Sequence, residues 1–200
     1  IILTELFPAM KSDVLSFLKI RGGYGQTGND ASPYLTSSYY FLAGVSDGFG
    51  KLTFPLSGHS GLLKSTSVPA TSLKPEISSE TEVGIDLRLF NNRLNFDFAF
   101  YNKITTNQIM KAELAPESGF LSNVRNVGKI QNMGYELSVG AVPVKTRDWE
   151  WNIGYTFSKN NNKVLELWDD VKETSIYGLT SGVQLKAIVG EPLGTWTYYK

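Results

Sequence analysis

Strict alternation of apolar and polar residues most limits what this chain can fold into. In the stretch from Thr81 to Phe90, the apolar side chains are those of Val83, Ile85, Leu87 and Leu89. The residues between them are Glu82, Gly84, Asp86 and Arg88. Successive side chains of a β-strand point to opposite faces, so a period of two predicts a strand with one apolar and one polar face.

A second alternating stretch follows almost at once. Its apolar residues are Leu94, Phe96, Phe98 and Phe100. Between the two stretches stands Asn91-Asn92, and asparagine tolerates the positive φ angles of tight hairpin turns. We therefore expect two antiparallel strands joined by a two-residue turn.

The same pattern recurs along the chain, and no useful helical period appears. Further alternating stretches cover residues 17–26, 134–141, 149–158 and 182–199, the last interrupted at Pro192. The sequence thus predicts an all-β, antiparallel fold of about six or seven strands.

The expected connections between these strands differ greatly in length. Two are short, at residues 91–92 and 145–148, and three are long, at residues 27–78, 105–127 and 160–181. Transmembrane β-barrels have short turns at one rim, long loops at the other, and aromatic girdles at the membrane interfaces. Phe90, Trp149 and Trp151 stand beside the short turns. We expect a transmembrane β-barrel, with a soluble β-sandwich that acts as a carbohydrate-binding or adhesive module as the alternative.

Composition argues against several functional classes. The 19 basic residues offset the 19 acidic ones, so no basic surface for nucleic acid is expected. Absence of cysteine excludes thiolate metal sites and cysteine nucleophiles. The G-x-G-x-x-G spacing at residues 23–28 is followed by turn-forming residues rather than by the helix that a dinucleotide site needs. The single His59 lies in a glycine-flanked loop, so we expect no enzyme, no catalytic residue, no cofactor and no metal.

Aromatic residues in the expected long loops are the candidate ligand-binding residues. They are Tyr34, Tyr39, Tyr40, Phe41 and Trp168, with Phe49 and Phe54 as further members of the group. The C–H faces of sugar rings stack on aromatic planes, so such loops suit glycan capture. The alternative is that these side chains pack the loops against each other or against a partner protein.

Several short phrases look familiar in their order and spacing. They are LSFLKIRGGYGQTGN (15–29), LKPE (73–76), GIDL (84–87), FNNRL (90–94), YNK (101–103), NVGKIQNMGYEL (126–137) and VGEPLG (189–194). Together they resemble the C-terminal barrel region of the SusC/RagA family, which are TonB-linked outer-membrane proteins of Bacteroidetes-type bacteria. Residues 32–72 and 169–181 match none of these phrases.

The resemblance implies a bacterial outer-membrane barrel of about 22 strands with a plugged lumen. It also implies a SusD-like surface lipoprotein as partner, TonB as the energy source acting through an N-terminal region, and oligosaccharide or peptide cargo. Residues 1–200 are expected to be part of a single barrel domain that begins mid-protein, without the plug. Half a dozen strands leave two unpaired edges, which hydrocarbon does not tolerate, so we expect no transport by this piece alone.

Overall fold

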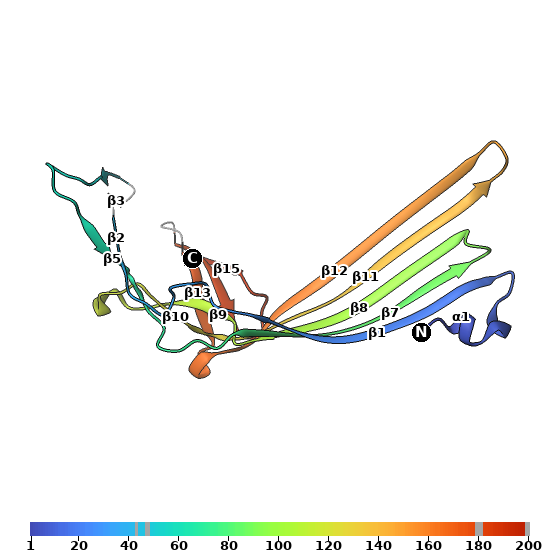
Figure 1. The fold of residues 1–200 in the computed structure, drawn as a ribbon, viewed down its shortest axis with the longest axis horizontal. Helices are drawn as coiled ribbons and strands as arrows, with labels where there is room; N and C mark the ends of the chain where they lie inside the picture. The colour runs from blue at the N-terminus through green and yellow to red at the C-terminus, as the bar shows by residue number, and fades with distance from the viewer. Residues whose placement is uncertain (43, 47–48, 179–181, 199–200) are drawn as a thin grey trace.

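The chain is almost entirely antiparallel β-structure arranged along one long axis (Figure 1). The computed structural model describes residues 1–42, 44–46, 49–178 and 182–198. Five long strands form a sheet at one end of the molecule, and shorter strands and loops occupy the other end. None of the helices in these described ranges has the length and apolar character needed to cross a membrane.

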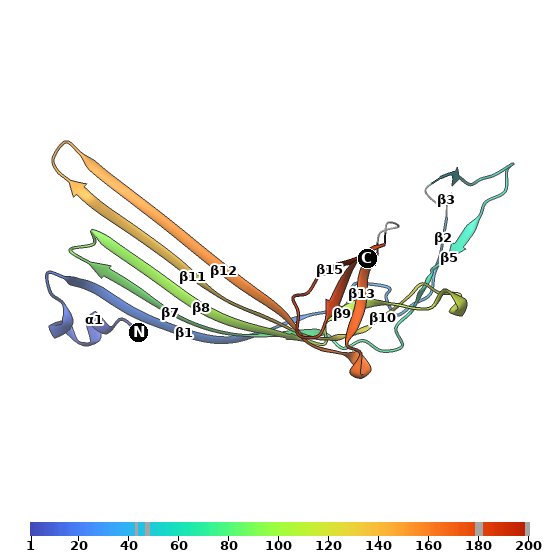
Figure 2. The same cartoon turned by 180° about the vertical axis from the view of Figure 1, so that it is seen from behind.

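The main sheet confirms the predicted long strands. In spatial order they are β1 (Leu15–Asn29), β7 (Glu76–Leu89), β8 (Leu94–Thr106), β11 (Gly128–Lys145) and β12 (Glu150–Leu167). Every neighbouring pair is antiparallel, and the strands lie side by side in both Figure 1 and Figure 2. The strands have 13 to 18 residues, whereas a transmembrane β-strand needs about 9–11. The sheet is open, with β1 and β12 at its edges.

Register across the sheet gathers the alternating residues into two faces. One cross-strand row of the apolar face is Ile20, Ile85, Phe98, Leu137 and Phe157. The adjacent row on the polar face is Lys19, Asp86, Asp97, Ser138 and Thr156. Because each row crosses all five strands, each face is uniform in character from edge to edge.

The apolar face lies open in the described part of the chain. Ile20 is 48% exposed, Val83 51% and Tyr155 57%. A β-sandwich would bury such a face under a second sheet, whereas a barrel turns it toward lipid. The exposure therefore favours the barrel over the sandwich.

The β7–β8 connection is longer than the predicted two-residue turn. It spans residues 90–93, and Phe90, Asn91 and Asn92 all have positive φ, at 53°, 54° and 66°. Phe90 N–H donates to Val14 O at 2.8 Å, and Asn91 N–H donates to Ser16 Oγ at 2.9 Å. These bonds to the start of β1 take Phe90 out of the ladder, which is why β7 ends one residue before it.

The other elements are short. Near the N-terminus lie α1 (Leu3–Leu6) and η1 (Pro8–Met10). The β1–β7 connection contains β2 (Tyr40–Leu42), β3 (Val45–Ser46), β4 (Lys51–Leu52), β5 (Leu62–Lys64) and β6 (Ser67–Val68). The β8–β11 connection contains β9 (Ile109–Glu113), η2 (Pro116–Ser118) and β10 (Ser122–Asn126). After β12 come η3 (Trp168–Asp170), β13 (Glu173–Gly178), β14 (Val183–Ile188) and β15 (Thr195–Tyr198).

The expected long loops therefore carry more regular structure than the alternation predicted. The prediction of one strand over residues 182–199 was wrong, because the chain folds back as the β14–β15 hairpin. Gly190 and Gly194 have φ of 95° and 87°, a left-handed conformation that favours glycine, and Pro192 between them lacks an N–H for a ladder. Residue 199 of that predicted strand lies outside the described residues.

Short turns and long connections lie at opposite ends of the strands, as predicted. The β7–β8 and β11–β12 turns share the end that also holds α1 (Figure 1). The β1–β7, β8–β11 and post-β12 segments share the other end, here called the outer end. A small apolar core there, with Val164 and Ala187 fully buried and Leu167 6% exposed, fixes the β13–β15 sheet to the end of β12.

Candidate binding clefts at the outer end

An arginine links three strands on the polar face of the main sheet. Arg21 of β1 donates from both Nη atoms to Asp97 of β8, at 2.8 Å each, and its Nε lies 3.5 Å from Glu82 Oε1. Its side chain crosses β7 over Gly84, where a Cβ would lie 2.6 Å from Nε. A bidentate arginine–carboxylate pair fixes geometry as well as charge. The polar face is therefore a braced, charged wall below the outer end.

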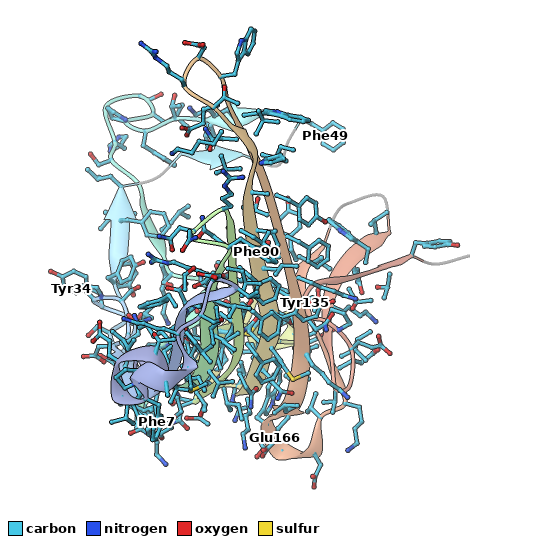
Figure 3. The ribbon with its side chains drawn as sticks, turned by 90° about the vertical axis from the view of Figure 1, so that its right-hand side faces the viewer. Phe7, Tyr34, Phe49, Phe90, Tyr135 and Glu166 are labelled. Atoms are coloured by element: carbon cyan, nitrogen blue, oxygen red, sulfur yellow. The ribbon has the colours of Figure 1, made fainter. Side chains whose placement is uncertain are left out.

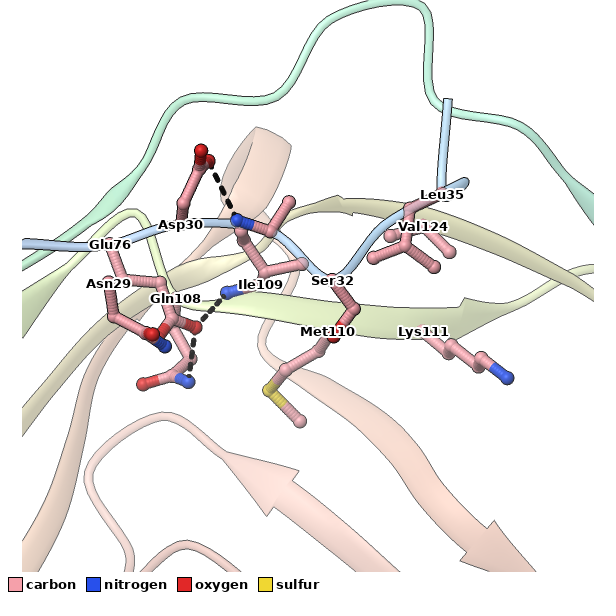
Figure 4. Close-up of a pocket in the computed structure, with 11 residues that line it drawn as sticks. Asn29, Asp30, Ser32, Leu35, Glu76, Gln108, Ile109, Met110, Lys111 and Val124 are labelled. Atoms are coloured by element: carbon pink, nitrogen blue, oxygen red, sulfur yellow. Dashed lines mark hydrogen bonds between the residues drawn. The ribbon is translucent and has the colours of Figure 1, made fainter. Parts of the chain in front are cut away.

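Glu76 ties three segments together where this wall ends. Its carboxylate accepts hydrogen bonds from Gln108 Nε2 at 2.7 Å, Ile109 N–H at 2.7 Å and Asn29 Nδ2 at 2.9 Å. Figure 4 shows Glu76, Asn29 and Gln108 grouped at one side of a cleft. The cleft, which we call the Glu76 cleft, has a volume of about 560 Å³. Its lining comprises Asn29, Asp30, Ala31, Ser32, Leu35, Glu76, Gln108, Ile109, Met110, Lys111 and Val124.

A second cleft, the tyrosine cleft, adjoins the first. Its volume is about 250 Å³. It is lined by Tyr34, Leu35, Ser37, Tyr39, Phe41, Ser65, Thr66, Ser67, Val68, Pro69, Lys111, Ser122 and Val124. Leu35, Lys111 and Val124 line both clefts, so the two share a wall. The tyrosine cleft thus combines aromatic rings, hydroxyl groups and one ammonium group.

Backbone hydrogen bonds hold the aromatic segment over a small sheet. The order in that sheet is β6-β10-β9, with Ser67 of β6 opposite Ser122 of β10. Ala70 N–H donates to Leu35 O at 3.0 Å, and Ser65 N–H donates to Tyr39 O at 3.2 Å. These bonds fix the backbone of residues 34–41 above the sheet, so the cleft is formed by backbone pairing and not by side-chain collapse.

The structure brings together three of the five predicted ligand-binding aromatics. Tyr34, Tyr39 and Phe41 line the tyrosine cleft, and the Tyr39 and Phe41 ring centroids are 6.2 Å apart at an interplanar angle of 53°. Tyr40 follows Tyr39 and precedes Phe41 in β2, so its side chain takes the opposite face and does not line the cleft. Figure 3 shows Tyr34 projecting at the side of the molecule, away from Tyr135 of the main sheet.

Trp168 lies in a different environment. It packs against the small core of Val164, Leu167 and Ala187. The Arg125 guanidinium carbon is 5.4 Å from the Trp168 ring centroid, and Arg125 Nη2 is 3.4 Å from Asp169 Oδ2. This placement matches the alternative reading, in which loop aromatics pack the loops together.

Two further loop aromatics also lie apart from both clefts. Phe54 covers Gly61, where a Cβ would lie 2.7 Å from Phe54 Cε1, and Phe49 is fully exposed. His59 forms a tight turn in which its N–H and C=O both pair with Leu56 at 2.9 Å. In the described ranges, no three His, Cys, Asp or Glu side chains come close enough together to hold a metal ion.

Sequence reasoning missed the polar members of the clefts. Glu76 stands within the LKPE phrase and Asn29 closes the LSFLKIRGGYGQTGN phrase, but nothing in the sequence shows that they meet Gln108. Lys111 was missed because it lies in an expected loop without a period. The missing signal is strand pairing between residues far apart in the chain.

Comparison with known proteins places the chain among outer-membrane receptors. The family model described as "TonB dependent receptor-like, beta-barrel" matches residues 12–196. TonB-dependent receptor P3 of Formosa agariphila is 32% identical over 163 residues, covering 79% of this chain and 15% of the receptor. TonB-dependent receptor SusC of Bacteroides thetaiotaomicron is 27% identical over 161 residues, covering 78% of this chain and 15% of SusC.

A solved structure shows the same fold. The structure titled "Structure of the RagAB peptide transporter" matches 96% of this chain and 20% of its own chain, with a TM-score of 0.76 and 24% sequence identity. The chain thus spans less than a fifth of the length of the curated relatives it matches.

Proposed function

The chain belongs to the TonB-dependent receptor family of β-barrels, and we propose that it forms part of the wall and outer mouth of an outer-membrane nutrient importer. Its apolar face contacts lipid, its polar face lines the lumen, and its long connections form the extracellular mouth. The observation that carries the proposal is the five-stranded sheet, which has one uniform apolar face, one uniform charged face, and its long connections at a single end.

The proposal extends to the partners and cargo of the whole protein. A SusD-like surface lipoprotein covers the mouth, TonB supplies energy through a region outside this chain, and the cargo is an oligosaccharide or a peptide. The likeness to SusC and to a structure titled as a peptide transporter supports both cargo classes. The barrel contributes binding and a path, and no enzymatic step is assigned to it.

Uptake by living cells tests the importer function. A strain that lacks the gene of the full-length receptor is expected to lose uptake of its cargo, and plasmid-borne receptor is expected to restore it. A strain without TonB is expected to lose uptake equally, because the barrel itself has no energy source. Accumulation of labelled oligosaccharide and peptide mixtures in the three strains is the measurement. Undiminished accumulation of both mixtures without the receptor would refute an importer role.

The tyrosine cleft predicts a difference between two adjacent tyrosines. Tyr39→Ala in the full-length receptor is expected to weaken cargo binding about tenfold, equivalent to about 1.4 kcal/mol. Tyr39 lines the cleft, whereas Tyr40→Ala removes a ring on the opposite face and is expected to change the dissociation constant less than about twofold. Isothermal titration calorimetry with the imported cargo measures both. Equal losses in the two variants would mean that these rings serve loop packing or a partner.

A further inference from the structure

Lys111 sets the charge of the tyrosine cleft. Among the residues that line this cleft, Lys111 is the single charged one, and no carboxylate or side-chain amide is present. Lys111 lies opposite Val124 in the β9–β10 ladder, so both side chains share the face that lines the cleft. A cargo in this cleft therefore meets one positive charge and no negative charge from the lining.

The Lys111 ammonium has no protein partner in the described part of the chain. The ion pairs of the described residues do not include it, and neither do their hydrogen bonds. Figure 4 shows its side chain directed away from Glu76. Glu76 already accepts three hydrogen bonds within its own cleft. Glu113 follows two positions later on the same face of β9 but lines neither cleft and forms no ion pair with Lys111.

Hydroxyl groups supply the remaining polar lining. They belong to Tyr34, Ser37, Tyr39, Ser65, Thr66, Ser67 and Ser122. Ser67 is notable because its Oγ is buried and lacks a hydrogen-bond partner among the described residues. A buried hydroxyl without a partner costs free energy until a partner arrives. The cleft is therefore short of an acceptor for an ammonium and of a partner for at least one hydroxyl.

We propose that the tyrosine cleft selects an oligosaccharide that carries an anionic substituent, either a carboxylate or a sulfate. A sugar ring packs on Tyr39 and Phe41, its hydroxyls bond the serine and threonine side chains, and Lys111 pairs with the anion. A neutral sugar would cover the ammonium without replacing its lost water, whereas an anion gives it a charge-assisted hydrogen bond. This inference rests on the proposed function, because it names the cargo class of the same importer.

The test uses the purified full-length receptor and four probes of matched length. They are tetragalacturonate, a sulfated carrageenan tetrasaccharide, neutral maltotetraose and tetraglutamate. At least one anionic sugar is expected to bind at least about tenfold more tightly than maltotetraose and tetraglutamate. Lys111→Met is expected to remove that preference, and Lys111→Arg is expected to keep most of it. The sugar that shows the Lys111 dependence identifies the anion as carboxylate or sulfate.

Lys64→Met is the matched control. Lys64 lies on β5, in the same β1–β7 connection that forms the cleft, and contacts the Phe120 ring at 5.1 Å to its centroid, but it lines neither cleft. Loss of this charge changes the net charge equally and is expected to alter binding less than about twofold. Outer-membrane abundance and the thermal midpoint of each variant report on folding.

Four results would overturn the inference. They are equal binding of maltotetraose, equal binding of tetraglutamate, unchanged preference in the Lys111→Met variant, and absence of binding by every probe. The importer function is judged separately by the uptake strains. Receptor-dependent uptake of a neutral sugar, together with an inert Lys111→Met substitution, would leave the importer standing and remove the anionic cargo.

Discussion

Replacing Leu137 with arginine is expected to prevent stable assembly of the barrel, whereas the same replacement at the adjacent Ser138 is expected to be tolerated. Leu137 lies in the apolar row between Phe98 and Phe157, near the middle of the apolar band. Arginine on the lipid face at the bilayer midplane costs about 2–4 kcal/mol. Ser138 takes the opposite face beside Asp97, where an added guanidinium has a wet, acidic neighbour.

The pair is informative because the two positions differ in face and in little else. They share a strand, a depth and a substituted residue. Urea unfolding of the full-length receptor in lipid vesicles gives the loss of folding free energy, and cell fractionation gives its abundance in the outer membrane. If Ser138→Arg were the more damaging change, the assignment of lipid and lumen faces would have to be reversed. Equal tolerance of both changes would contradict a membrane location for this sheet.

A second large effect is expected where a glycine lies beneath a tyrosine. Gly134 of β11 pairs with Tyr101 of β8, and a Cβ at Gly134 would meet the Lys159 backbone oxygen and lie 2.6 Å from the Tyr101 hydroxyl. The Tyr101 ring can shift, but the Lys159 carbonyl belongs to the β11–β12 ladder and cannot move without breaking it. Gly134→Ala is therefore expected to destabilise the barrel by about 1–3 kcal/mol.

Gly140→Ala is the matched control for Gly134→Ala. Gly140 lies on the same strand and the same polar face, yet its Cβ would meet only the Asn95 side chain, at 3.8 Å or more. That distance is an ordinary van der Waals contact, so stability is expected to stay the same or rise slightly through the lower entropy of the unfolded chain. Thermal and urea unfolding of both full-length variants supply the comparison. A Gly134→Ala variant as stable as Gly140→Ala would show that β12 yields locally.

Much of the fold was predictable from periodicity. The strand from Thr81 and the strand from Leu94 were both expected, and so was the apolar identity of one face. The error at Phe90 came from a tertiary contact, because Val14 and Ser16 on another strand capture the turn backbone. The split of residues 182–199 had a local signal in Pro192 and its flanking glycines.

The candidate clefts were predictable only in part. Grouping loop aromatics found Tyr34, Tyr39 and Phe41, and it included Trp168, which packs on a small apolar core instead. An aromatic residue in a loop reads the same whether it faces solvent or packs inward. Lys111 and Ser67 carry no sequence signal, because polar residues in loops are ordinary until a neighbour fails to pair with them.

The sequence by itself determined the strand type, the two-faced character of the wall and the short-turn and long-loop asymmetry. Each of these depends on residues within a few positions of each other, and the period of two is fixed by backbone geometry. Only the tertiary structure decided that Glu76 would meet Asn29 and Gln108, and that Lys111 would remain unpaired among the described residues of the tyrosine cleft. Those relations arise from the register between distant strands, which alternation leaves open because it names the face of a residue and not its neighbour.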